Sequence, residues 1–335
     1  MTSGLVSIGL PVYNGADDLR RSLDSLLSQT HTNFELIISD NASTDAVTQR
    51  ITEEYAARDP RIRLTRQQNN RGAITNFLWV LNQSRGEFFM WAAHDDAWAD
   101  DYIDKLVNSL VAAPDAVLAT PTTLVEMTMR TGAKQLQTIP AAPNAGCQAT
   151  LDVFIEHIAC TWIYGMYRSE WLKTAAPEML KYPLLYGDII WMYGLLLERQ
   201  VVGNADARFH YTAVQGKRRE LTPSLKMKLW AIVLYQTIRL TWSRVPRAKR
   251  LLGLRKACWF YYRHHVRRGN PVGTTVRIIK LLVMWSWFGL KQMASAIWAR
   301  LQSTTKSLSH ERIQTTHAVQ TNSPSLMKCE ERHAA

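Results

Sequence analysis

The chain has 335 residues, of which 47% are hydrophobic and 20% charged. This composition is that of a globular protein with a sizeable core, and it excludes a chain that is disordered throughout. The net charge of +12 is unevenly distributed: residues 1–213 hold 17 Lys/Arg and 24 Asp/Glu, whereas residues 214–335 hold 23 and 4. A net acidic half joined to a strongly basic half indicates two separate tasks.

The cysteines are few and scattered, with no CxxC pair among Cys147, Cys160, Cys258 and Cys329. Their spacing argues against a zinc site or a disulfide framework and is typical of a reducing compartment. The first residues, MTSGLVSIGLPVYN, lack the basic region of a secretory signal. We therefore expect a cytoplasmic protein.

The first third of the chain alternates between apolar runs and helical patterns. The apolar runs predict strands at Leu5–Leu10, ended by Pro11, and at Phe34–Ser39, Arg61–Thr65 and Phe88–Ala93. The helical patterns cover Asp17–Gln29, a helix capped by Ser43 or Thr44 that ends near Arg58, Gly72–Gln83 and Asp100–Ala113. Strands that alternate with such helices imply βαβ units, so the expected fold class is α/β, with a mostly parallel sheet flanked by helices.

The pattern is weaker after this point. Ala116–Thr120 predicts a strand, and residues 121–149 fit either a flexible loop over a site or a small excursion of the sheet. The remaining expectations are a helix at Leu151–Ala159, an extended segment at Trp162–Tyr167, a loop at Tyr182–Gly187, a helix at Asp188–Arg199 and a short hairpin at Val201–His210. We expect one domain at 1–213, divided into halves at 1–120 and 121–213.

A basic helical extension is predicted at 214–301. Leu225–Trp242, Leu251–His265 and Thr275–Leu301 place apolar and aromatic residues on one side and Lys/Arg on the other. None contains the ~18–20 uncharged apolar residues that cross a bilayer. The pattern fits helices that lie in a membrane interface, or an ordinary bundle packed on the first domain. Residues 302–335 are polar and aperiodic, which predicts a disordered tail.

Two adjacent acids follow the fourth predicted strand. Asp95 and Asp96 end a buried apolar run, so their charges repel each other and need compensation. A hard divalent cation bridged to phosphate oxygens would compensate them, since Mg²⁺ and Mn²⁺ prefer carboxylates and phosphates. The alternative is a turn whose Asp caps the next helix.

Polar residues also follow the other strands. Pro11, Tyr13 and Asn14 follow the first, and Asp40 follows the second, with Ser43 and Asp45 close by. The segment Asn70-Arg71-Gly72 opens the third helix, where backbone N–H groups and a cation favour phosphate. In open α/β sheets ligands lie beyond the carboxyl ends of the strands, so these residues are candidates for one nucleotide site.

This ordered set resembles the family 2 glycosyltransferases, which have a GT-A fold. The resemblance covers roughly residues 5–115 and consists of the opening strand with Pro-x-Tyr-Asn, the segment FELIISDNASTD, Asn70-Arg71-Gly72 with Asn76, and Arg85-Gly86-Glu87-Phe88 leading to Asp95-Asp96. It implies a nucleotide-diphospho-sugar donor and a divalent metal, Mn²⁺ or Mg²⁺.

The resemblance also implies roles for single residues. Pro11, Tyr13, Asn14, Ser43 and Gly72 would border the nucleotide, Asp40 would hold the base, and Arg71 would lie near the base or phosphates. Asp95 and Asp96 would be the later carboxylates of the family's Asp-x-Asp signature, one facing the ribose and the other the metal; both are candidate metal ligands, and Asp95 is also a candidate nucleotide-sugar contact. The family usually has another Asp upstream, where this chain has Ala93, followed by His94; that histidine is a candidate ligand or sugar contact, or a structural residue.

A general base is expected in the second half of the domain. Gly187-Asp188 opens a helix at the place where the family carries an acidic base, and direct displacement requires a carboxylate to take the acceptor's proton. The alternative is that Asp188 caps its helix. Asp152 and Glu156 are weaker candidates, and Trp191 would stack on a sugar or pack in the core.

These patterns predict an inverting glycosyltransferase that acts on a lipid-linked or polysaccharide acceptor at the inner face of the cytoplasmic membrane. One alternative is a non-catalytic nucleotide-sugar-binding module of the same fold. Nucleic-acid binding through the basic half ranks lower and is not expected, because no reading motif is present.

Overall fold

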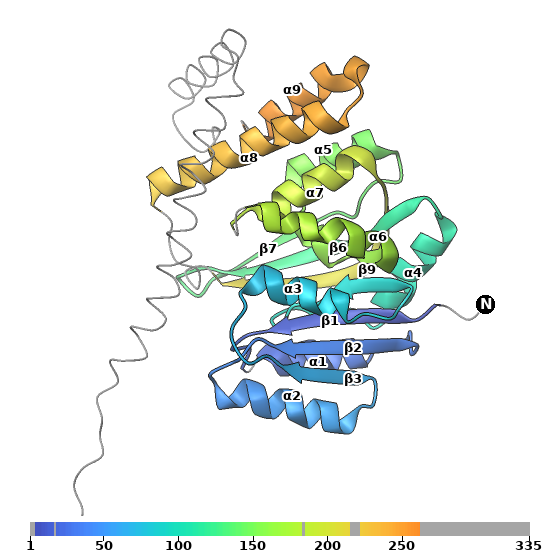
Figure 1. Cartoon of the computed structure of the whole chain (residues 1–335), viewed down its shortest axis with the longest axis vertical. Helices are drawn as coiled ribbons and strands as arrows, with labels where there is room; N and C mark the ends of the chain where they lie inside the picture. The colour runs from blue at the N-terminus through green and yellow to red at the C-terminus, as the bar shows by residue number, and fades with distance from the viewer. Residues whose placement is uncertain (1–3, 17, 183–184, 215–221, 262–335) are drawn as a thin grey trace, which may run out of the picture. The chain divides into compact units, whose positions relative to one another are not determined.

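The computed structural model describes residues 4–16, 18–182, 185–214 and 222–261 (Figure 1). All of them lie in the first of two units, Met1–Gly269; the second, Asn270–Ala335, is outside the described residues. Within the described part, nine strands form one mixed sheet in the order β3-β2-β1-β4-β8-β6-β9-β5, with β7 paired to β6. The strands are β1 (Val6–Val12), β2 (Phe34–Asp40), β3 (Ile62–Arg66), β4 (Phe88–Trp91), β5 (Ala97–Trp98), β6 (Ala116–Thr128), β7 (Lys134–Ile139), β8 (Met166–Arg168) and β9 (Gln200–Val214).

Helices cover both faces of this sheet, with α3 on one face and α1 on the other (Figure 1). The α-helices are α1 (Asp18–Leu27), α2 (Ala46–Arg58), α3 (Ala73–Asn82), α4 (Tyr102–Ala112), α5 (Cys147–His157), α6 (Ser169–Ala175), α7 (Gly187–Glu198), α8 (Pro223–Arg244) and α9 (Arg250–Tyr261). Short 3₁₀ helices lie at η1 (Cys160–Tyr164), η2 (Ala176–Lys181) and η3 (Arg247–Lys249). The predicted α/β class with helices flanking a sheet is confirmed.

The first four strands bring the candidate residues to one edge. β1 pairs in parallel with β2 and β4, and β2 pairs in parallel with β3. The prediction that Pro11 ends the first strand is wrong, because β1 continues to Val12. Pro11 lies beyond the last β1–β4 pair, Gly9–Trp91, where β4 is no longer beside β1 to receive an N–H.

Alternation along β1 builds two cores, one on each face. Val6, Ile8, Leu10 and Val12 are buried in a cluster with apolar residues of α1, α2 and α4. On the other face, a Cβ on Gly9 would come within 2.7 Å of Val80 of α3 and of Phe89, so a side chain there would push α3 off the sheet. The strand is therefore buried on both faces, as its continuous apolar run predicts.

The second half departs more from the predictions. Residues 121–149 form an excursion of the sheet, the second of the two alternatives, because β6 runs to Thr128 and pairs with β7. The predicted extended segment Trp162–Tyr167 is wrong in its first half, since η1 occupies it up to Tyr164, and is confirmed at its end, where β8 begins at Met166. The predicted hairpin at Val201–His210 is also wrong: β9 is one strand that pairs with β6 and β5.

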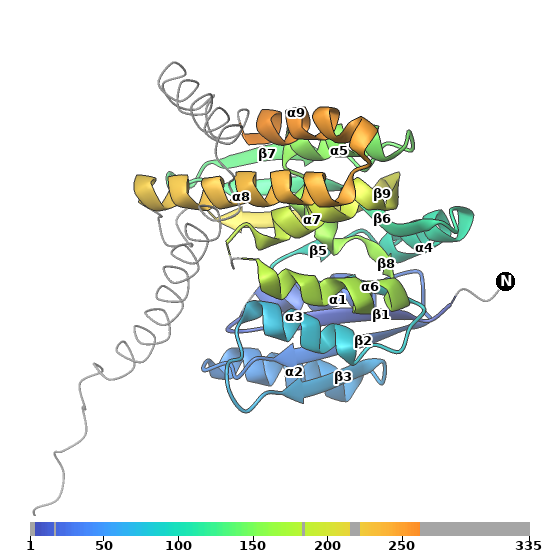
Figure 2. The same ribbon diagram turned by 45° about the horizontal axis from the view of Figure 1, so that its top comes forward.

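The C-terminal helices pack on the rest of this unit, with α8 against α7 and α9 against α5 and α8 (Figures 1 and 2). The predicted helix at Leu225–Trp242 corresponds to α8 and the one at Leu251–His265 to α9, which is described only to Tyr261. Searching the described residues finds no helix long and apolar enough to cross a membrane. The helix at Thr275–Leu301 and the tail at 302–335 lie outside the described residues, and the domain limits stay predictions.

Candidate functional site

Asp96 is the most unusual side chain at the carboxyl edge of the sheet. It is completely buried; its Oδ1 accepts a hydrogen bond from the Thr212 N–H of β9 at 2.9 Å, and its Oδ2 has no partner. Burial raises the pKa of Asp96 to about 8, and the charge of Asp95 adds to the rise, against the Thr212 hydrogen bond and the charge of Arg21. A buried carboxylate oxygen without a partner is the kind of atom that a ligand or cation satisfies.

Two side chains of α1 hold the loop that carries both acids. The Arg21 guanidinium of α1 donates to the Asp95 carbonyl oxygen at 2.5 Å and to Thr212 Oγ1 at 3.2 Å. Ser22 of α1 donates to the Ala93 carbonyl. The alternative that an Asp of this loop caps the next helix is not what the structure shows, because the N-cap position of α4 is Asp101.

The acid of the second half approaches the same place. Burial raises the pKa of Tyr164 in η1, and the charges of Asp96, Asp95 and Asp188 raise it further. Three carboxylates from two distant parts of the chain, Asp95-Asp96 and Asp188, therefore lie within electrostatic reach of one phenol. Asp188 lies in the first turn of α7, and the N-cap position is Tyr186, so the capping alternative does not describe Asp188.

Hydrogen bonds join the ends of β1 and β2. The Asn14 N–H donates to Ser43 Oγ at 2.9 Å, and Asn14 Oδ1 accepts from the Thr44 N–H at 2.9 Å. Asn14 has a positive φ of 50°, which asparagine tolerates better than most residues. Asp40 is buried, and its Oδ1 accepts from the Ser43 N–H at 2.8 Å.

The cap of the helix after β2 differs from the prediction. Its N-cap is Asp45, which accepts from the Thr48 N–H at 2.6 Å, and neither Ser43 nor Thr44 holds that position. Ser43 Oγ instead accepts a hydrogen bond from the Asn14 N–H, and this bond joins the end of β1 to the end of β2.

Asn41 orders the segment before α3. Its side chain accepts from the Arg71 N–H at 2.9 Å and donates to Asn70 Oδ1 at 2.9 Å, and Asn70 in turn accepts from the Gly72 N–H. Arg71 is exposed, and Gly72 at the N-cap has a φ of 81°, a conformation that favours glycine. The segment therefore presents a cation and a helix N-terminus at the same edge as Asp40.

The remaining candidates are His94, Pro11 and Tyr13, near the carboxyl ends of β4 and β1, and Trp191 of α7. His94 is partly exposed and packs on Gly15, where a Cβ would come within 3.0 Å of its ring. Pro11 is buried in β1 and Tyr13 is partly exposed directly after it. Trp191 is buried, donates to the Ala175 carbonyl and packs edge-on against Trp91, so it has the surroundings of a core residue and not of a sugar platform.

Sequence reasoning missed Arg21, Asn41, Thr212 and Tyr164. Arg21 looks like any exposed charge on an amphipathic helix, and Thr212 is separated from Asp96 by more than a hundred residues. Only Asn41 had a usable signal, because it directly follows Asp40 at the end of a buried strand.

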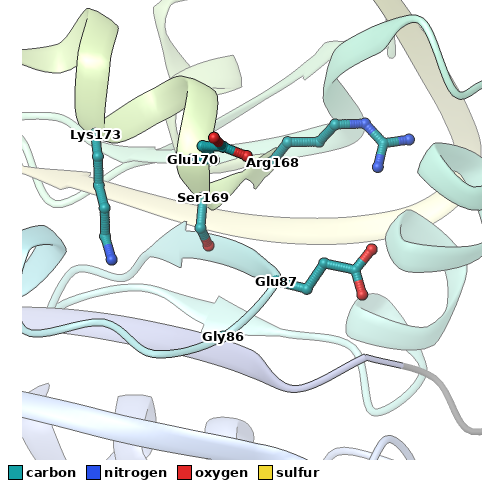
Figure 3. Close-up of a pocket in the computed structure, with 6 residues that line it drawn as sticks. All are labelled: Gly86, Glu87, Arg168, Ser169, Glu170 and Lys173. Atoms are coloured by element: carbon teal, nitrogen blue, oxygen red, sulfur yellow. The ribbon is translucent and has the colours of Figure 1, made fainter.

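A pocket of about 430 Å³ lies at the opposite edge, before β4 begins (Figure 3). Its lining mixes cations with carboxylates: Gly86, Glu87, Arg168, Ser169, Glu170 and Lys173. The cations are engaged, because Lys173 donates to the Ser84 carbonyl at 2.7 Å and Arg168 to the Leu110 carbonyl at 2.8 Å. This pocket is separate from the edge that holds the acids and is not suited to a diphosphate.

Comparison with known proteins decides the family. Residues 7–172 match the model of the family described as glycosyl transferase family 2. This part of the chain belongs to that family. TuaG of Bacillus subtilis, which is named for teichuronic acid biosynthesis, is 34% identical to this family 2 chain over 107 residues, or 32% of this chain and 42% of TuaG. An uncharacterized glycosyltransferase of Rickettsia typhi is 35% identical over 108 residues, or 32% of each chain. The chain spans less than half the length of the curated relatives that it matches.

A solved structure shares the fold. The crystal structure of S. aureus TarS 1–349 in complex with UDP-GlcNAc has a TM-score of 0.59 and 18% identity, and the similarity covers 78% of this chain and 73% of that one. At this identity the likeness shows the fold, so the family 2 domain has the mixed, curled sheet of a GT-A protein.

Proposed function

We propose that the chain is an inverting glycosyltransferase that moves a sugar from a nucleotide-diphospho-sugar to an acceptor hydroxyl. The observation that carries this proposal is Asp96, which is completely buried at the carboxyl edge of a family 2 domain with one oxygen unpartnered. Such a carboxylate is costly to keep unless something that binds the protein compensates it. TarS, which shares the fold, was crystallised with UDP-GlcNAc.

The donor would lie across the ends of β1, β2 and β4. Asp40, Asn14 and Tyr13 would border the base, and Asp95 would accept from a ribose hydroxyl. The exposed Arg71 side chain and the N-terminus of α3 favour a phosphate group through the positive charge of the guanidinium and the helix dipole. Because Asn41 already holds this segment, little ordering would remain to be done on binding.

The residues present fit a divalent cation, Mn²⁺ or Mg²⁺. Asp96 and Asp95 supply hard oxygen ligands, and Oδ2 of Asp96 is available. Among the described residues, no group of three or more His, Cys, Asp or Glu could hold a metal by itself, so donor phosphates would have to complete the coordination. When bound, the cation would stabilise charge on the departing diphosphate.

Asp188 would act as the general base. It would take the proton of the acceptor hydroxyl while that oxygen bonds to the anomeric carbon and the bond to the diphosphate breaks, which inverts the configuration. The shared influence of Asp188 and Asp96 on Tyr164 supports a common site.

The acceptor would be lipid-linked or polysaccharide, in line with the name of TuaG. We propose that the chain reaches such acceptors at the inner face of the cytoplasmic membrane, as a peripheral protein held by its basic C-terminal half. No nucleic acid is expected as a partner.

Transfer measured on the purified chain tests the enzymatic proposal. With a panel of nucleotide sugars, Asp188→Asn should lower kcat by about 10²- to 10⁴-fold and leave the donor KM nearly unchanged. Asp96→Asn and EDTA should each abolish transfer. Asp115→Asn, which changes an exposed acid far from the edge, is the matched control and should behave as wild type.

A non-catalytic nucleotide-sugar-binding module is the second candidate, because Ala93 stands where the family usually has an acid. Donor binding by wild type without transfer or hydrolysis of any nucleotide sugar in the panel would favour the module over the enzyme.

A further inference from the structure

The helix α9 has two sides of opposite character. Leu251 is 81% exposed and Trp259 51%, and Arg255 is exposed between them, whereas Gly253 and Ala257 are buried. Two residues correspond to about 200° around a helix, so the exposed and buried series lie on opposite sides. The buried side packs closely, since a Cβ on Gly253 would come within 2.5 Å of Thr241 in α8.

The end of α8 also carries exposed apolar and basic residues, next to the exposed side of α9. Trp242, in the last turn of α8, is 58% exposed, and the Arg250 guanidinium lies 5.0 Å from the centre of its ring. Arg239, one turn earlier, and Arg247 of η3 are also exposed. We define the outer face of α8–α9 by its exposed apolar and basic residues, which are Arg239, Trp242, Arg247, Leu251, Arg255 and Trp259.

The charge of this face is not balanced locally. Residues 222–261 contain nine Lys/Arg and no Asp or Glu. Two of these cations point back to the first domain, where Arg244 binds Glu178 bidentately at 2.7 Å and Lys256 binds Asp152. By contrast, Arg239, Arg247 and Arg255 of the outer face have no acid in α8 or α9 to neutralise them.

The positive charge of the outer face limits which partner could bind there. Residues 262–335 hold 11 Lys/Arg and 3 Asp/Glu, so the remaining chain has the same sign, and a second copy would present the same basic face. Nucleic acid matches the charge, but a highly exposed leucine with two exposed tryptophans gains more from a hydrocarbon boundary. Indole rings are suited to the level of lipid headgroups, and arginines beside them pair with lipid phosphates.

We propose that the outer face of α8–α9 docks on an anionic phospholipid bilayer, with Trp242, Leu251 and Trp259 inserted at the headgroup level and the three arginines against lipid phosphates. This names the contact surface for the membrane location proposed above. It does not depend on catalysis, which is assayed separately with soluble donor.

Vesicle flotation with the full chain tests the docking. Wild type should float with phosphatidylcholine/phosphatidylglycerol vesicles, remain below with phosphatidylcholine alone, and be released by high salt. Each Arg→Gln change at 239, 247 or 255 should lower partitioning about fivefold, equivalent to about 1 kcal/mol per charge. The triple variant Trp242→Ala/Leu251→Ala/Trp259→Ala should lower it at least tenfold.

Two matched controls separate this face from general stickiness. Leu136→Ala and Val111→Ala remove exposed aliphatic residues from the first domain, where they are 77% and 55% exposed. Arg50→Gln, Arg199→Gln and Arg208→Gln, each made singly, remove one exposed charge from the first domain, as each arginine variant does from the outer face. Both sets of controls should float like wild type.

The docking is refuted if the aromatic and arginine variants float as well as wild type, or if wild type ignores anionic vesicles and instead shifts RNA at the same salt. Should the aromatic variant fail to fold, as judged by circular dichroism, the arginine series alone decides. Donor hydrolysis without vesicles should be equal in wild type and variants; its absence in wild type would instead count against the proposed enzyme.

Discussion

Glu35 in β2 shows how single residues hold a charge inside this sheet. Its carboxylate accepts from Ser7 Oγ at 2.6 Å, from the Arg63 guanidinium at 2.6 Å and from the Arg85 N–H at 2.8 Å. Burial acts to raise the pKa of Glu35, but these hydrogen bonds outweigh it and leave the pKa below its usual value. The charge is therefore a stabilising part of the fold, unlike that of Asp96.

Glu35→Gln should destabilise the chain by about 2 kcal/mol at neutral pH, because the amide accepts fewer bonds and leaves Arg63 without its ion pair. Since the folded pKa is depressed, the stabilising contribution is present above the unfolded pKa of about 4.3 and is lost as pH falls through the folded pKa. Urea unfolding of both proteins as a function of pH measures this, and the difference should shrink below about pH 4.

Glu54→Gln is the control, since Glu54 pairs with Arg20 on the surface and should change stability little. A pH-independent difference between wild type and Glu35→Gln would contradict the assignment of the lowered pKa.

Single residues of the site differ in how far the sequence reveals them. Asp95 and Asp96 stand out because two acids end a buried apolar run, and Asp188 because it opens a helix. Arg21 and Thr212 carry no such local signal. They matter through contacts made across the fold, and composition and periodicity do not encode those contacts.

At the scale of elements, an ion-pair network fastens α8 to η2 and α7, which lie between residues 121 and 213. Arg244 of α8 binds Glu178 of η2 bidentately and lies 3.5 Å from Glu198 of α7, while Tyr182 also donates to Glu178 at 3.0 Å. Gly194 makes room for it, because a Cβ there would come within 2.9 Å of the guanidinium. The network holds α8 against α7, the helix that begins beside Asp188.

A double-mutant cycle with Arg244→Met and Glu178→Gln should give a coupling free energy of about 1–3 kcal/mol in chemical unfolding, because both groups are partly buried. The same cycle on Arg20 and Glu54, whose side chains are 41% and 38% exposed compared with 19% and 25% for Arg244 and Glu178, should give less. Equal coupling in the two cycles would mean that burial adds nothing to the Arg244 pair.

Elements of the first half were predictable, whereas in the second half the sequence predicted only the start of β6, at Ala116–Thr120, and took β9 for a hairpin. Up to α4, the alternation of strands and helices is visible in the sequence as apolar runs that alternate with helical patterns. In β9 the turn-like residues Gly203, Asn204 and Asp206 lie where the β6–β9 register shifts, so a bulge in one strand looked like the turn of a hairpin. The pairing of β9 with β5 is long-range and leaves no local pattern.

At the scale of the whole molecule, the sequence divides into an acidic part and a basic part, and the described unit shows where they meet. Asp95, Asp96 and Asp188 of the acidic part lie within electrostatic reach of Tyr164, and the outer face of α8–α9 carries cations with no acid in those helices. Ligand binding at the edge should therefore be visible as a change in the stability of the whole folded unit.

A thermal-shift series tests this. A nucleotide-diphospho-sugar at 100 times its Kd should stabilise the chain by about 2.7 kcal/mol, seen as a rise in Tm of a few degrees. The rise should require Mn²⁺ or Mg²⁺ and should be lost in Asp96→Asn, while Asp115→Asn keeps it. A rise in Tm of equal size without a metal would contradict a cation in the donor site.

The bond from Thr212 to Asp96 comes from the main chain. Every amino acid except proline carries the same N–H at that position, so mutation can alter the residue at 212 widely without taking this donor away. A comparison of related chains would consequently find position 212 variable in type but closed to proline. An essential contact can thus leave its mark on a sequence as one forbidden residue.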